Sequence, residues 1–129
     1  MTKIAGEYPN TSFDTTRHYL KSHPEVVKRF LLAMATAVHE YKNNPLIAIP
    51  LTRNFLQIKN EGDAKAAYEA YVKIYPDDLR PSIEGIQLVL NEIAKKSPKA
   101  ATMKPEQLID TSTLDALQRE GVFKKLAGK

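Results

Sequence analysis

Apolar residues recur at intervals of three and four along most of this chain, which is the period of an α-helix with one buried face. The clearest example runs from Ser22 to Tyr41, where the apolar positions are Val27, Phe30, Leu31, Met34, Val38 and Tyr41. Ser22 and Glu25 have the spacing of a capping box, and Pro24 fits the first turn because its nitrogen needs no hydrogen there. We therefore predict a long helix over 22–41.

The next apolar segment, 46–58, is opened by Pro45 and interrupted by Pro50. A proline inside a helix removes one backbone hydrogen bond and crowds the preceding turn. We therefore expect two short helical segments joined at Pro50 instead of one continuous helix.

Two further helices follow in the middle of the chain. One runs from about Asp63 to Tyr75 and ends at Pro76; its apolar side consists of Ala64, Ala67, Tyr68, Tyr71, Val72 and Tyr75. After a loop over 77–81, Ser82 caps the other. Its apolar face consists of Ile83, Ile86, Leu90, Ile93 and Ala94.

The last quarter of the chain contains two helix starts and one helix stop. Pro105 fits the first position of a short helical turn, and Ser112 with Asp115 has capping-box spacing for a second helix. Gly121 can adopt the left-handed conformation just past that helix. We therefore expect the helix to end at Gly121.

Only the first fifteen or so residues lack a helical period, and Ser12–Thr16 have the character of one short strand. The predicted fold class is therefore mainly α, with about five to six helices plus this short N-terminal strand. We expect a single domain over 1–129, in which 1–17 form the strand and a crossover and 18–129 are helical.

The composition indicates a globular chain of one-domain size, with 43% hydrophobic and 26% charged residues in 129. Cysteine is absent, which excludes disulfides, thiolate metal sites and thiol nucleophiles but leaves the compartment open. The first residues lack the apolar run of a signal peptide, and no stretch reaches membrane-spanning length. We expect no direct membrane insertion.

The net charge of +4 prompts the question of nucleic-acid binding. The lysines, however, are scattered over the tail and one loop or mixed with acids, and no basic run alternates with aromatic residues. This pattern favours a solvated surface, so we expect no nucleic-acid partner.

Candidate chemistry is sparse. The histidines, His18, His23 and His39, lack the i, i+4 pairing of a helical metal site, and the adjacent acids Asp77 and Asp78 are typical of a solvated turn. The sequence also lacks a serine elbow, a phosphate-binding glycine loop and a nucleotide fingerprint. We expect no catalytic residues, no cofactor and no metal, and hence a protein that is not an enzyme.

Four groups of residues, in order along the chain, resemble one protein family. They are Thr11-Ser12-Phe13-Asp14-Thr15-Thr16-Arg17 leading into His23-Pro24-Glu25, the alanine-rich stretch 33–41, Pro81-Ser82-Ile83-Glu84-Gly85-Ile86-Gln87, and Lys104-Pro105-Glu106 through Asp110-Thr111-Ser112 to Gly121-Val122-Phe123. Together they resemble the solute-binding proteins of ABC importers for nitrate, taurine, aliphatic sulfonates and thiamine precursors. The resemblance covers nearly the whole chain.

This resemblance implies the C-terminal portion of a two-lobed α/β periplasmic-binding-protein fold, so the chain would be a partial domain. The implied function is capture of a small solute for an ABC permease, outside the cytoplasm. If Met1 is the true start, the absence of a signal peptide implies a cytoplasmic protein instead. We also expect the isolated chain to self-associate through apolar faces that the rest of such a protein would cover.

The resemblance places Thr11 and Ser12 at the end of a strand near the ligand cleft, where their hydroxyls would donate to a polar or anionic solute. The alternative is local turn hydrogen bonding. Arg17 could pair with an anionic ligand, or form a surface salt bridge instead. A different class of function, a free-standing helical interaction module that binds no ligand, remains open.

Overall fold

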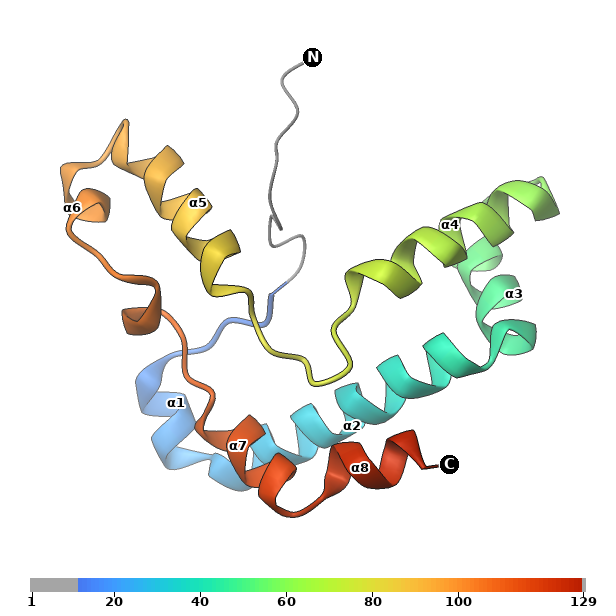
Figure 1. Ribbon diagram of the computed structural model, residues 1–129, viewed down its shortest axis with the longest axis horizontal. Coiled ribbons are helices and arrows are strands. Elements are labelled where there is room, and N and C mark those ends of the chain that lie inside the picture. Colours follow the sequence, from blue (N-terminus) through green and yellow to red (C-terminus); the bar gives the residue numbers. More distant parts are fainter. Residues whose placement is uncertain (1–11, 129) are drawn as a thin grey trace. The chain divides into compact units, whose positions relative to one another are not determined.

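The computed structural model describes residues 12–128, which are mainly helical (Figure 1), and this confirms the predicted mainly α class. The helices are α1 (Arg17–Ser22), α2 (Pro24–Asn43), α3 (Pro45–Phe55), α4 (Glu61–Ile74), α5 (Ile83–Ala94), α6 (Pro98–Ala101), the 3-10 turn η1 (Pro105–Gln107), α7 (Ser112–Arg119) and α8 (Val122–Ala127). None of the helices within 12–128 combines the length and the apolar character needed to cross a bilayer.

The chain divides into two compact units, each discontinuous in sequence. The first unit combines the described residues up to Ser22 with Arg80–Ser112, and the second combines His23–Leu79 with the residues from Thr113 onward. The organisation of 1–129 as a single partial domain stays a prediction.

The strand expected over Ser12–Thr16 is wrong, because these residues form no strand. A strand needs a neighbouring strand for its backbone groups, and none occurs within 12–128. The polar side chains make local contacts instead. The Thr16 hydroxyl accepts a hydrogen bond from the backbone N–H of Tyr19 at 3.1 Å, so this segment leads into α1 as its N-terminal cap.

The long helix α2 extends from Pro24 to Asn43, close to its predicted range, but the capping role predicted for Ser22 is wrong. Ser22 is the last residue of α1, and its hydroxyl donates back to the carbonyl oxygen of His18 at 2.8 Å. Pro24 instead begins α2, because its fixed φ angle already matches that of a helix.

Helix α3 is continuous from Pro45 to Phe55, so the division expected at Pro50 is wrong. Proline within a helix costs about 3 kcal/mol, partly because the carbonyl four residues earlier loses its donor. Here that carbonyl belongs to Leu46, in an exposed first turn. The other side of α3 is buried at Ala48 and Thr52, and the helix packs against α2 and α4. This packing keeps the helix intact.

Helices α4 and α8, together with α7 from Thr113 onward, complete the second unit with α2 and α3. α4 begins two residues before its predicted start, because the Asn60 side chain accepts hydrogen bonds from the backbone N–H groups of Gly62 and Asp63 at 2.7 and 3.3 Å. α8 packs beside α2 (Figure 1). Nearby, the Lys28 ammonium donates to the Glu120 carboxylate at 2.5 Å, and this hydrogen bond raises the pKa of Lys28 above its usual value.

The end of α7 at Gly121 is confirmed, since this residue has a φ of 75° in the left-handed region. The start is one residue earlier than predicted, because Ser112 is the first helical residue and not its cap. Buried Leu114 and Leu117 anchor α7 in the protein interior. α8, which follows Gly121 directly, was not indicated by the sequence pattern.

The first unit is organised around α5, which packs against α6 and η1. The predicted cap is confirmed: the Ser82 hydroxyl accepts a hydrogen bond from the backbone N–H of Gly85 at 3.0 Å. The buried residues of this unit are Gly85 and Leu90 on α5, Ala100 on α6 and Pro105 on η1. The short elements α6 and η1 thus cover one side of the amphipathic helix α5.

Candidate functional site

Of the residues that the family resemblance places near a ligand, Thr11 lies outside the described residues. Ser12 is exposed, and its hydroxyl donates to the two carboxylate oxygens of Asp14 at 3.2 and 3.4 Å. These contacts are the local hydrogen bonding of the alternative interpretation.

Arg17 is exposed at the start of α1 and contacts the segment that contains η1. Its Nη2 atom donates to the backbone carbonyl oxygen of Gln107 at 2.5 Å. Its positive charge also helps to lower the pKa of Asp110, so the two side chains interact electrostatically. Arg17 therefore connects α1 to the 105–110 segment within the first unit through a backbone carbonyl.

Asp110 lies just before α7 and fixes the backbone there. Its carboxylate accepts hydrogen bonds from the Ser112 hydroxyl at 2.5 Å and from the Ser112 backbone N–H at 3.0 Å. These two bonds, with a smaller contribution from Arg17, hold the pKa of Asp110 below its usual value. Asp110 is therefore ionised throughout the neutral range and holds the start of α7.

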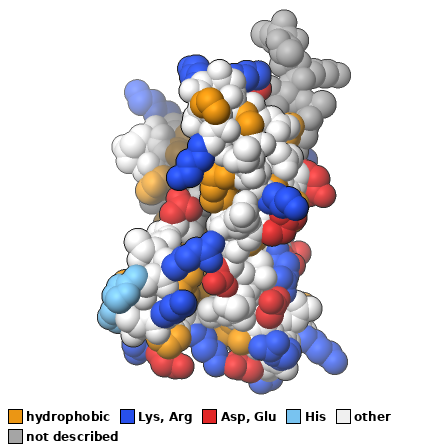
Figure 2. Space-filling view, turned by 90° about the vertical axis from the view of Figure 1, so that its left-hand side faces the viewer, with side chains coloured by type: hydrophobic (Ala, Val, Ile, Leu, Met, Phe, Trp, Pro, Cys, Tyr) orange, Lys and Arg blue, Asp and Glu red, His pale blue; other side chains and the backbone are white. Residues whose placement is uncertain are grey.

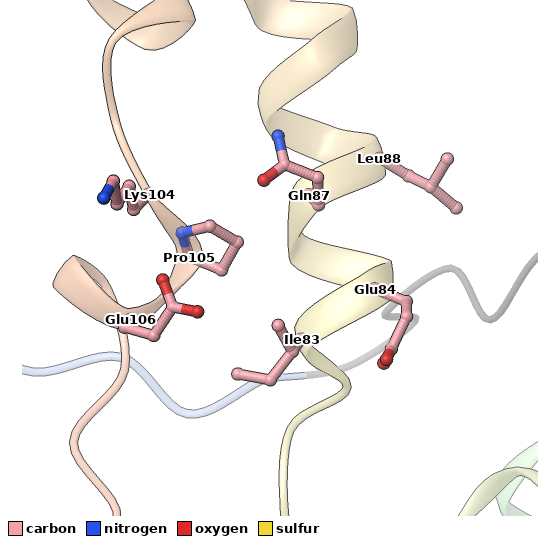
Figure 3. Close-up of a pocket in the computed structure, with 7 residues that line it drawn as sticks. All are labelled: Ile83, Glu84, Gln87, Leu88, Lys104, Pro105 and Glu106. Atoms are coloured by element: carbon pink, nitrogen blue, oxygen red, sulfur yellow. The ribbon is translucent and has the colours of Figure 1, made fainter.

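The first unit contains an open groove between α5 and η1, shown in Figure 3, with a volume of about 680 Å³. The buried ring of Pro105 lies on the η1 side and points toward α5. Apolar and polar side chains both contribute to the groove, which is lined by Ile83, Glu84, Gln87, Leu88, Lys104, Pro105 and Glu106.

The η1 side of this groove is fixed by a closed set of hydrogen bonds. The backbone N–H of Lys104 donates to the Gln107 side-chain oxygen at 2.8 Å, and the Gln107 N–H donates to the Lys104 carbonyl at 3.0 Å. The N–H of Leu108 donates to the Pro105 carbonyl at 2.9 Å. Together with the Ser82 cap on α5, these bonds give the groove two rigid sides.

The charges around the groove are mixed, with two carboxylates, from Glu84 and Glu106, and one ammonium, from Lys104. Such a surface can hydrogen-bond a polar molecule but does not select one sign of charge. Within 12–128, no group of three or more histidine and acidic side chains could hold a metal ion. Figure 2 likewise shows basic and acidic side chains interspersed on one face of the molecule. None of these features indicates catalysis.

The second unit contains a cluster of tyrosines from α2 and the end of α4. The rings of Tyr41 and Tyr68 have centroids 5.3 Å apart, and Tyr75 lies 6.4 Å from Tyr41 and 6.2 Å from Tyr71. Burial, and secondarily the neighbouring Tyr71 and Tyr41, raise the pKa of Tyr75. The Tyr68 hydroxyl donates to the Lys42 carbonyl at 2.9 Å. These rings pack together in the second unit, and the hydroxyls of Tyr41 and Tyr68 have hydrogen-bond partners.

Lys42 connects the ends of α2 and α4 beside this cluster. Its ammonium donates to the Tyr75 carbonyl at 3.0 Å and to the Asp77 carboxylate at 2.5 Å. The carbonyl of Tyr75 is left without a donor where α4 stops, so Lys42 satisfies it. One of the paired acids in the 77–81 loop thus has a structural role.

The groove residues were not found from the sequence. In the sequence, Ile83 is recognisable only as part of a helix face and Pro105 only as a helix start. No motif connects α5 with η1. Local sequence signals exist only for the turns beside the groove: Ser82 has the character of a helix cap, and in Asp110-Thr111-Ser112 the aspartate side chain accepts a hydrogen bond from the N–H two residues later.

Neither a protein-family model, nor a curated protein, nor a solved structure matches this chain. The family resemblance therefore depends on the four sequence motifs alone.

Proposed function

We propose that this chain supplies the helical C-terminal part of a solute-binding protein of an ABC importer in the nitrate, taurine, sulfonate and thiamine-precursor group. Its role is capture of a small solute outside the cytoplasm for delivery to a permease, without catalysis. The proposal also implies that the whole protein has a two-lobed α/β fold. The observation that carries it is the order of the four family-like motifs along the chain.

The positions of these motifs in the fold support the proposal. Thr16 caps α1, Pro24 begins α2, Ser82 caps α5 and Gly121 separates α7 from α8. Three of the four motifs, all except the alanine-rich stretch, therefore contain a residue that sets a helix boundary by its own local chemistry. A family whose members share these helix starts, in the same order, would keep these boundary residues.

The proposed ligand groups are the hydroxyls of Thr11 and Ser12 and the guanidinium of Arg17. Arg17 donates one of its five N–H groups to Gln107 and is exposed at the surface. A planar guanidinium suits nitrate and sulfonate oxygens, since it can donate to two of them at once. We therefore assign the anionic members of this solute group as the favoured ligands.

A thermal-shift titration tests the proposal. The protein is isolated from its own cells, so that any segment encoded with it is retained, and is titrated with nitrate, taurine, an alkanesulfonate and a thiamine pyrimidine. A ligand present at 100 times its Kd stabilises the native state by about 2.7 kcal/mol, which raises the melting temperature by several degrees.

The matched variants are Arg17→Met and Arg29→Met, because Arg29 is also exposed but lies on α2, which belongs to the other unit. The shift should disappear in the first variant and persist in the second. No shift with any of the four solutes, or an equal loss in both variants, would contradict the proposal.

The exposed apolar side of α3 favours a second candidate function, that of a free-standing helical interaction module. Ile47, Leu51 and Phe55, four residues apart, share one side of this helix, and each has more than half of its surface in solvent. Such a face is typical of a protein–protein contact. Intact-mass measurement on the cellular product separates the two candidates: a mass of 14.5 kDa with no ligand shift favours the module. A longer product with a ligand shift favours the solute-binding protein.

A further inference from the structure

Four exposed lysines lie near one another where α5 ends and the short elements α6 and η1 follow. They are Lys95, Lys96, Lys99 and Lys104, which we call the lysine cluster. The Lys95 ammonium donates to the Glu92 carboxylate at 2.7 Å, but both side chains are mostly in solvent, so this ion pair contributes little. The other three lysines form no ion pair with a residue of 12–128. Their charges are therefore available to a partner.

Backbone hydrogen bonds keep this part of the first unit compact. The N–H groups of Lys96 and Ser97 both donate to the Ile93 carbonyl, at 2.9 and 2.8 Å, and the Ala100 N–H donates to the Ser97 carbonyl at 3.0 Å. The short helix α6 thus folds back beside the end of α5 (Figure 1). Four residue steps span at most about 14 Å in an extended chain, and these turns shorten that distance. The first three lysines of the cluster therefore produce one local positive potential.

The stability of the fold does not account for the whole cluster. Lys95 and Lys96 follow the last turn of α5, where the helix dipole favours a positive charge. The other two lysines gain nothing comparable, because α6 has only four residues and Lys104 precedes η1 instead of following it. Neighbouring ammonium groups also repel one another. An anionic partner would remove this repulsion.

The neighbours of the cluster favour an anionic lipid surface over other anionic partners. Ile93 is 48% exposed and lies three residues before Lys96, so an apolar side chain stands beside the ammonium groups. A bilayer surface accepts both, since lipid phosphates take the ammonium groups and the acyl boundary takes the apolar side chain. Nucleic acids and acidic proteins are typically bound through arginine or aromatic side chains, and 92–104 contain neither. We propose that the lysine cluster and Ile93 bind reversibly to the surface of anionic membranes.

Co-sedimentation of the full 129-residue chain with phosphatidylcholine vesicles, with and without phosphatidylglycerol, tests this inference. Each lysine beside an anionic bilayer raises the partition constant about fivefold, so the three unpaired lysines should give roughly a hundredfold preference for the anionic vesicles. Sodium chloride should abolish the preference, because the Debye length falls from about 10 Å at 0.1 M to about 3 Å at 1 M.

Two matched double variants locate the contact. Lys96→Gln with Lys99→Gln should weaken binding to the anionic vesicles about 25-fold. Lys124→Gln with Lys125→Gln lowers the net charge equally, but these exposed lysines lie on α8, in the other unit. This control should weaken binding less than about threefold, because charges outside the contact are screened. Ile93→Gln should weaken binding about fivefold through the lost apolar contact. Far-UV circular dichroism confirms that each variant remains helical, and the lysine variants decide the outcome if Ile93→Gln unfolds.

Several results would overturn the inference. They are equal binding to neutral and anionic vesicles, and an equal loss in the two double variants. Binding to single-stranded DNA or polyglutamate as tight as to the anionic vesicles would assign the cluster to a nucleic acid or an acidic protein instead. Displacement by inorganic phosphate beyond that by sodium chloride of the same ionic strength would assign it to a soluble phosphate. Thr11, Ser12 and Arg17 do not enter this test, so it is independent of the proposed function.

Discussion

Replacing Thr52 by valine should destabilise the second unit, because the Thr52 hydroxyl connects two parts of its core. Thr52 is 5% exposed, and its hydroxyl donates to the Ala48 carbonyl at 2.8 Å. It also lies 2.7 Å from the Tyr41 hydroxyl. Threonine has one hydroxyl hydrogen, which the Ala48 carbonyl takes, so Tyr41 must be the donor in the second bond. Thr52→Val keeps the side-chain shape and leaves the half-buried Tyr41 hydroxyl without its acceptor.

The expected magnitude follows from this asymmetry. A polar group left unsatisfied away from water costs about 1–3 kcal/mol, whereas deleting both partners of a hydrogen bond costs much less. Tyr41→Phe removes the donor and leaves Thr52 bonded to Ala48, so we expect a loss of about 0.5–1.5 kcal/mol. In the double variant the loss should fall short of the sum by about 1 kcal/mol, which is the coupling between the two hydroxyls.

Urea unfolding followed by tyrosine fluorescence measures these free energies, since the chain has six tyrosines and no tryptophan. Thr36→Val is the matched control. The Thr36 hydroxyl also donates to the carbonyl four residues earlier, that of Leu32 at 2.9 Å, but it is exposed. Its loss should cost less than about 0.5 kcal/mol. The reasoning is refuted if Thr52→Val costs no more than Thr36→Val, or if the Thr52 and Tyr41 substitutions are additive.

Three other predictions concern the C-terminal half of the chain. Leu117→Ala should cost about 2–5 kcal/mol in urea unfolding, because this side chain is 1% exposed and its removal leaves a cavity; a loss below 1 kcal/mol would contradict this. Gly121→Ala should cost about 1–2 kcal/mol because of its φ of 75° alone, since an added Cβ would meet nothing within 4 Å. Gly128→Ala, at a φ of −93°, is its control and should be nearly neutral. The lowered pKa of Asp110 stabilises the folded state above the usual aspartate pKa of 3.8, and this contribution is lost as the pH falls through the lower folded value. Asp110→Asn should therefore flatten the loss of stability on acidification below about pH 4, and an unchanged acid profile would refute it.

Sequence reasoning was most successful where local chemistry decides the structure. The period of α2, the Ser82 cap and the left-handed glycine at 121 each depend on residues within one or two turns, and all three are confirmed. The boundary at Ser22 was missed because two candidate starts lie side by side, and Pro24 is the one that begins α2.

The remaining differences arise from contacts between distant residues. Pro50 breaks a helix in isolation, but Ala48 and Thr52 bury the opposite side of α3, and no local pattern contains that information. α8 has only six residues and is helical beside α2, far away in the sequence. The groove between α5 and η1 has the same origin, because its two sides come from segments joined by α6 and a loop. The resemblance to solute-binding proteins indicated none of these contacts.

The packing of α8 beside α2 has a consequence for biosynthesis. A ribosome that adds about 5–20 residues per second needs roughly 4–16 s to proceed from Asn43 to Val122. During that interval Lys28 has been synthesised but its partner Glu120 has not. The nascent second unit must therefore wait for the last turns of the chain before its surface is complete. Chaperones that bind apolar helix faces would meet this chain chiefly in that interval.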